Sequence, residues 1–68
     1  MNILVERETK GRYLVYDKKG KFIFSLVRDD RYNVWKFDAI QSGYEFLQDK
    51  KFSTYMLAKD FLTTQFNT

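Results

Sequence analysis

Two adjacent carboxylates, Asp29 and Asp30, form the one pair of side chains in this 68-residue sequence that could do acid–base chemistry. Histidine and cysteine, the commonest general base and the strongest side-chain nucleophile, do not occur in the sequence. Paired acids catalyse when they face each other across a pocket, whereas neighbours in an exposed turn point apart and stay solvated. We therefore interpret the pair as turn residues flanked by Arg28 and Arg31, and we expect a protein that is not an enzyme.

Ligands for a metal ion or a cofactor are also missing from the sequence. Zinc sites of the usual type need Cys or His, and Asp29 and Asp30 lack the further oxygen ligands that Ca²⁺ demands. The three glycines, Gly11, Gly20 and Gly43, are isolated from one another, so no glycine-rich phosphate loop is present. We expect no catalytic residue, no cofactor and no bound metal ion.

Basic residues interleaved with tyrosines form a candidate nucleic-acid site. On a sheet, aromatic side chains stack with bases while neighbouring cations follow the phosphates. The formal net charge of +3 permits such binding without requiring it, because acidic residues are interspersed among the basic ones. The run at 18–21 is typical of a solvated hairpin tip more often than of a phosphate clamp. The candidate contacts of this alternative are Arg12, Lys18, Lys19, Lys21, Arg31 and Tyr32.

Apolar periodicity predicts the elements that would carry these residues. Short runs with alternating or β-branched side chains, separated by turn residues, predict four strands, and residues 44–47 are left open between a fifth strand and an irregular connection. After Phe52 the apolar spacing becomes helical, and Ser53 is the expected N-cap. The expected strands cover residues 2–7, 12–17, 21–28 and 34–38, and the expected helix covers residues 54–66.

These elements predict an α+β fold, in which a four- or five-stranded antiparallel meander sheet carries one C-terminal amphipathic helix on one face. The chain is short enough to form a single domain, residues 1–68, with a small core. Seven Phe, five Tyr and one Trp supply much of the apolar area of that core. We expect Trp35, which alternates with Phe37, to belong to it.

The sequence also bears on the compartment of the protein. Small secreted domains usually carry disulfides, and this chain has no cysteine. The apolar run at 3–5 is too short for a signal peptide, and no stretch of about 18 apolar residues predicts a membrane-spanning helix. We therefore expect a cytoplasmic protein without a membrane partner.

The strands expected at 12–17 and 21–28 are apolar on both sides, although one helix can cover only one face of a sheet. Three covers for the second face are open: curling of the sheet, the segment 39–52, or another molecule. Closed two-fold dimers are the commonest assemblies and place the same patch against itself. The candidate protein interface consists of Ile23, Val27, Leu14 and Tyr16.

Together these observations predict a small non-enzymatic interaction module that acts by binding protein, with a second copy of itself as the expected partner. Its size would suit a homodimeric accessory or regulatory protein of a bacterium or a phage. The alternative is a nucleic-acid-binding module that uses the basic hairpin of Lys18, Lys19 and Lys21 together with tyrosines of the sheet.

Overall fold

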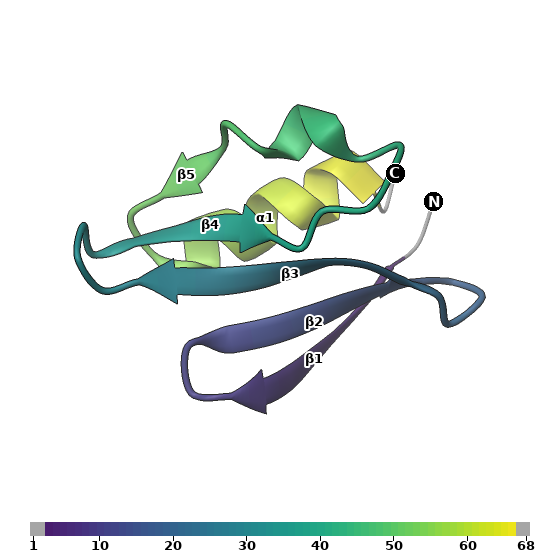
Figure 1. Cartoon of the computed structure of the whole chain (residues 1–68), viewed down its shortest axis with the longest axis horizontal. Coiled ribbons are helices and arrows are strands. Elements are labelled where there is room, and N and C mark those ends of the chain that lie inside the picture. Colours follow the sequence, from purple (N-terminus) through teal and green to yellow (C-terminus); the bar gives the residue numbers. More distant parts are fainter. Residues whose placement is uncertain (1–2, 67–68) are drawn as a thin grey trace.

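One antiparallel sheet and one helix make up the protein, in the α+β arrangement that the sequence predicts (Figure 1). A computed structural model describes residues 3–66 of the chain. The five strands lie in chain order, so each strand pairs with its neighbours in sequence. The elements are β1 (Ile3–Thr9), β2 (Arg12–Asp17), β3 (Phe22–Asp29), β4 (Val34–Asp38), the 3₁₀ helix η1 (Glu45–Leu47), β5 (Lys51–Phe52) and α1 (Tyr55–Phe66).

The fifth strand is not at residues 44–47. That segment forms η1 instead, and the fifth strand is the two-residue β5, which pairs with β4. Ala39 turns the chain out of β4 with φ +49°, and the amide of Gln41 then donates to the carbonyl oxygen of Ile23 at 2.9 Å. The connection therefore follows β3 briefly before it coils, and it buries Leu47 completely.

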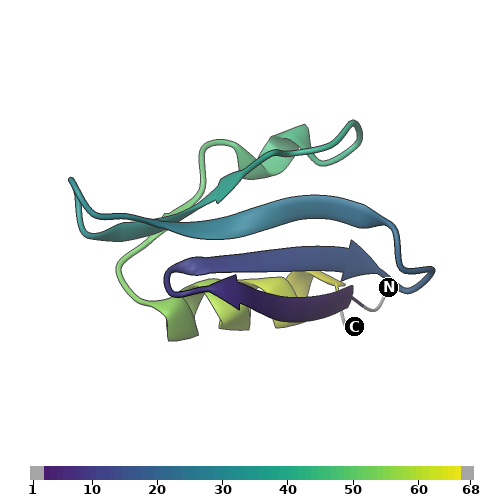
Figure 2. The same ribbon diagram turned by 60° about the horizontal axis from the view of Figure 1, so that its bottom comes forward.

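Packing between the sheet and α1 builds the core. Figures 1 and 2 show α1 running along the strands on one face of the sheet. Phe24 of β3 lies at the centre of this layer, with its ring centroid 5.2 Å from that of Phe37 and 6.1 Å from that of Phe66. Tyr44 contacts both Phe24 and Phe66, so the connection 39–50 joins the helix layer. It therefore does not cover the opposite face of the sheet, which we call the open face.

A β-bulge changes which side chains of β3 point to the open face. Val15 pairs with Phe24, but the next residue of β2, Tyr16, pairs with Phe22, so Ile23 is the extra residue. The rings of Tyr16 and Phe22 meet edge to face at 6.1 Å, which places Phe22 on the face of Tyr16. Ile23 is 1% exposed and belongs to the core of the chain.

Thr54, and not the predicted Ser53, caps the N-terminus of α1. The amide of Leu57 donates to Thr54 Oγ1 at 3.2 Å, which satisfies one of the amide groups that the first helical turn leaves without a partner. With the helix in this position, Ala58, Leu62 and Phe66 face the core. Leu57 is 51% exposed, because it lies one position away from that buried row.

The cap predicts a measurable difference between two neighbouring residues. Thr54→Ala removes the hydrogen bond to the Leu57 amide and should lower the free energy of unfolding by about 1 kcal/mol. Ser53→Ala is the matched control and should change it by less than half of that. Urea denaturation followed by circular dichroism measures both variants, and equal losses would contradict the assignment of the cap.

Candidate functional site

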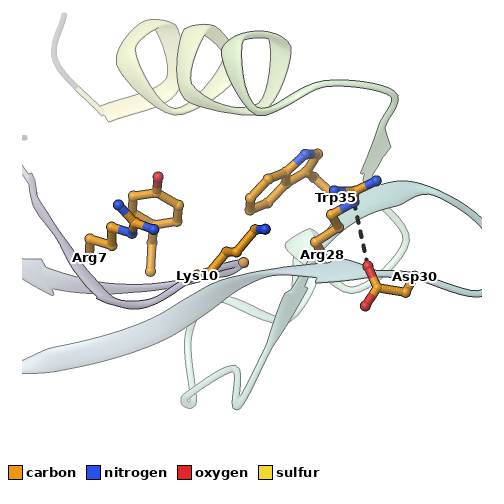
Figure 3. A pocket seen from close by; sticks show the side chains of 7 residues that line it. Arg7, Lys10, Arg28, Asp30 and Trp35 are labelled. Carbon is orange, nitrogen blue, oxygen red and sulfur yellow. Dashed lines mark ion pairs between the residues drawn. The ribbon is translucent and has the colours of Figure 1, made fainter.

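A cavity of about 570 Å³ opens at one end of the sheet, on the face that carries α1 (Figure 3). It lies where the β1–β2 turn meets the β3–β4 end of the sheet. Figure 3 shows Lys10 between Arg7 and Trp35, with Arg28 and Asp30 beyond Trp35. We call this cavity the basic pocket, and its lining residues are Arg7, Lys10, Gly11, Tyr13, Arg28, Asp30 and Trp35.

Turn geometry brings the basic residues of the pocket together. Gly11 has φ +81°, a left-handed conformation that other residues adopt rarely, and it allows the chain to reverse directly after Lys10. The amide of Arg28 donates to the carbonyl oxygen of Gly11 at 2.9 Å, which fastens the turn to β3. Cross-strand pairing sets Arg7 opposite Tyr13 and Arg28 opposite Trp35, so all four share the face of α1.

The rings of Tyr13 and Trp35 form an aromatic wall of the pocket, and Tyr55 packs against both of them. Tyr55, the first residue of α1, stacks on Tyr13 with centroids 4.5 Å apart, and Trp35 lies 5.4 Å from Tyr55 and 5.9 Å from Tyr13. Burial, with a smaller contribution from Tyr13, raises the pKa of the Tyr55 phenol, so that ring stays neutral at physiological pH. Trp35 is half-buried: it packs against the core as the sequence predicts, and it also lines the pocket.

The charges in the pocket are unbalanced. Arg7, Lys10 and Arg28 are cationic, whereas Asp30 is the one acidic residue in the lining. Arg28 Nε lies 3.5 Å from Asp30 Oδ1, and Arg28 Nη2 donates to Asn33 Oδ1 at 2.6 Å. Within residues 3–66, neither Arg7 nor Lys10 forms an ion pair. The pocket therefore offers two cations without an anionic partner and a third whose partner, Asp30, has a 90% exposed side chain.

On the open face, by contrast, cations and acids are paired. Arg12 Nε lies 3.0 Å from Glu8 Oε1, and Lys36 Nζ lies 3.2 Å from Asp29 Oδ2. Burial opposes the charge on Asp29, but the hydrogen bonds from Lys36 and from the Arg31 amide outweigh it, and the pKa of Asp29 lies below its usual value. These cations have anionic partners within the chain, unlike Arg7 and Lys10.

The structure does not bring together the six residues predicted as nucleic-acid contacts. Alternate turns of a meander lie at opposite ends of the sheet, so the lysines at 18–21 are remote from the basic pocket in a molecule 33 Å long (Figure 1). Arg12 points to the open face, where Nη2 also lies 3.5 Å from Ser25 Oγ. Arg31 and Tyr32 are exposed on the β3–β4 turn, with the guanidinium 5.7 Å from the ring centroid.

The predicted basic hairpin is nevertheless well formed. The amides of Lys19 and Lys21 donate to Asp17 Oδ1 at 2.9 and 3.0 Å. The hydrogen bond from Lys21 is the largest cause that holds the pKa of Asp17 below its usual value, and the bond from Lys19 acts in the same direction. Lys18, Lys19 and Lys21 are exposed, and the rings that flank this hairpin, Tyr16 and Phe22, pack against each other on the open face.

Of the predicted interface residues, Leu14, Tyr16 and Val27 are half-buried on the open face, whereas Ile23 lies in the core and offers no surface to a partner. Leu4, which the sequence analysis did not select, is 53% exposed and pairs with Tyr16. Leu4, Tyr16 and Phe22 thus form a continuous apolar row across three strands. Val27 stands apart from this row, between Arg12 and Lys36.

Sequence reasoning missed the three cations of the basic pocket. Arg7 was part of a strand, Lys10 a turn residue and Arg28 a flank of the Asp29-Asp30 pair, so nothing in their spacing linked them. The two-residue turn at Lys10-Gly11 does not reveal them either, because regular pairing from that turn would set Glu8 opposite Tyr13. A register shift between Arg7 and Thr9 sets Arg7 there instead.

No cluster of three or more acidic, His or Cys side chains within residues 3–66 is arranged to hold a metal ion. The helices in that range are too short or too polar to cross a membrane. Comparison with models of protein families, with curated proteins and with solved structures finds no match to this chain.

Proposed function

We propose that the chain is a non-enzymatic nucleic-acid-binding module, and that the basic pocket holds a nucleotide of a single strand. The observation that supports this is the combination, in one cavity, of two cations that form no ion pair within residues 3–66, Arg7 and Lys10, with the half-buried wall of Tyr13 and Trp35. The absence of cysteine supports a cytoplasmic location for such a module.

Charge favours an anionic ligand. Three cations that line one cavity repel one another, and one exposed carboxylate offsets only part of that repulsion. The phosphate of a bound nucleotide and those beside it on the strand would be attracted to these cations, and hydrogen bonds between ionised partners are the stronger kind. On the open face, Arg12 and Lys36 already have acidic partners in Glu8 and Asp29, so a bound anion would compete with those carboxylates.

The aromatic wall favours a ligand with a flat ring beside its phosphate. Tyr55 supports Tyr13 and Trp35 from the side of α1, so the wall is fixed before any ligand arrives. Bases stack on such side chains with little dependence on sequence, at about 1–3 kcal/mol per base. The volume lies within the range of sites for small ligands, roughly 300–1,000 Å³, and suits a single nucleotide.

Binding of a single-stranded oligonucleotide should change the fluorescence of Trp35, the one tryptophan in the chain, and should weaken with salt. Three phosphate contacts at about −0.7 each give a slope of roughly −2 for the logarithm of the affinity against that of the salt concentration. The affinity should therefore fall roughly 20-fold between about 50 and 200 mM salt. Titration of a mixed-sequence oligonucleotide at both concentrations measures this fall.

Two double variants locate the site. Arg7→Gln with Lys10→Gln removes two cations of the pocket, and the salt slope should fall from roughly −2 to about −0.7. Lys18→Gln with Lys19→Gln removes the same charge at the opposite end of the sheet and should keep the slope of the wild type. Loss of binding in the hairpin variant alone would move the site to the hairpin. No binding by the wild type at about 50 mM salt would end the proposal.

Protein binding is the second candidate function, and the apolar row of Leu4, Tyr16 and Phe22 supports it. This row lies on the face that α1 leaves open, and soluble proteins use such patches for interaction. A second copy of the chain could place the same row against its own, as closed two-fold dimers do. The row and the basic pocket are on opposite faces and at opposite ends of the sheet, so both functions are compatible.

Leu4→Lys tests the dimer. A charge at this exposed position is tolerated in water but not across an apolar interface, so the variant should be a folded monomer where the wild type is a dimer. Met56→Lys, on the 64% exposed position of α1, is the control and should remain dimeric. Sedimentation equilibrium at ~100 µM measures both, since weak specific pairs have about micromolar affinity. A monomeric wild type at that concentration would remove this candidate.

A further inference from the structure

We infer that the basic pocket recognises a terminal phosphate, a phosphomonoester at the end of a nucleic-acid strand, in preference to the diesters within the strand. This inference rests on the proposed nucleic-acid binding and specifies which part of the strand the pocket holds.

The first argument is the charge of the site. Arg7, Lys10 and Arg28 against Asp30 give the lining a formal charge of +2. A diester carries one negative charge, which would leave the pocket with an excess of positive charge. A monoester carries about −1.5 to −2 at pH 7 because its second pKa is near 6. The terminal group therefore neutralises the pocket where an internal phosphate does not.

The second argument is the way the cations converge. A surface that follows successive phosphates places its cations along a groove. Here the three cations come from three different elements, namely β1, the β1–β2 turn and β3, and they line one cavity (Figure 3). The tight turn at Gly11 is hydrogen-bonded to β3, and Figure 3 shows Lys10 between Arg7 and Trp35. Such a cluster suits one multiply charged group with three acceptor oxygens.

The third argument concerns pH, because a phosphomonoester loses charge between pH 7 and pH 5. The chain has no histidine, and carboxylates ordinarily titrate near pH 4 and lysines above pH 10. Burial moves the Tyr55 phenol still further from this range. A pH dependence between 5 and 7 would therefore report the ligand. The titratable side chains that line the pocket are Arg7, Lys10, Tyr13, Arg28 and Asp30, and Tyr55 packs on Tyr13.

The experiment compares three oligothymidylates that carry equal numbers of phosphates. Two have four nucleotides and a terminal phosphate, which is at the 5′ end of one and at the 3′ end of the other. The third has five nucleotides and hydroxyl groups at both ends. At pH 7 we expect one of the phosphorylated tetranucleotides to bind roughly tenfold more tightly than the pentanucleotide, as measured by Trp35 fluorescence. At pH 5 the ratio should fall to about threefold or less.

Variants connect the preference to the pocket. Lys10→Gln should remove most of the preference for the terminal phosphate, whereas Lys18→Gln, an exposed lysine of the distant hairpin, should keep it. Equal affinity for all three oligonucleotides at pH 7 would overturn the inference and leave the proposed function intact. Failure of all three to bind at about 50 mM salt would overturn both. A preference that survives unchanged at pH 5, or in Lys10→Gln, would also overturn the inference.

Discussion

The arrangement of this protein depends on a single constraint, which is that one short helix must cover a five-stranded sheet. A helix of 12 residues is about 18 Å long, while the molecule extends over 33 Å. Phe24, Phe37 and Phe66 fix α1 over β3 and β4, where burial of large rings stabilises the two layers. At the end of the sheet that carries the β1–β2 turn, the start of α1 contacts β2 through Tyr55 and Tyr13, and the basic pocket opens beside this contact.

The same constraint explains why the two faces differ in their charges. Side chains of the open face have no second layer to pack against, and their cations are neutralised by acids of neighbouring strands, as in the pairs Arg12–Glu8 and Lys36–Asp29. On the face of the sheet that carries α1, Arg7 and Lys10 line a cavity and form no ion pair within residues 3–66. Surface ion pairs contribute little to stability, so this contrast concerns what each face can bind.

Periodicity in the sequence was sufficient for β1 to β4 and for α1, and insufficient for β5 and wherever strand pairing or hydrogen bonding decides the outcome. The alternation of Val34 to Asp38 predicts β4 directly, because one face of that strand is buried. The bulge that turns Ile23 into a core residue is invisible, since it depends on how Tyr16 pairs with β3. The pocket was hidden for the same reason: Arg7 and Arg28 are distant in sequence and meet only through the pairing of three strands.

Trp35 shows why binding and stability are connected at this site. Its ring packs against Tyr55 at the start of α1 and also lines the basic pocket. One side chain therefore contributes both to the core and to the aromatic wall of the pocket. Replacing it would open a cavity beside α1 and remove the stacking surface at once, which makes such a variant uninformative about binding. The exposed cations do not have this double role. Arg7 and Lys10 are exposed and line the cavity, so we expect that their charge can change while the aromatic wall and its support by α1 stay in place. Within the pocket, the wall therefore provides a fixed surface, and the cations provide the selectivity for the charge of the ligand.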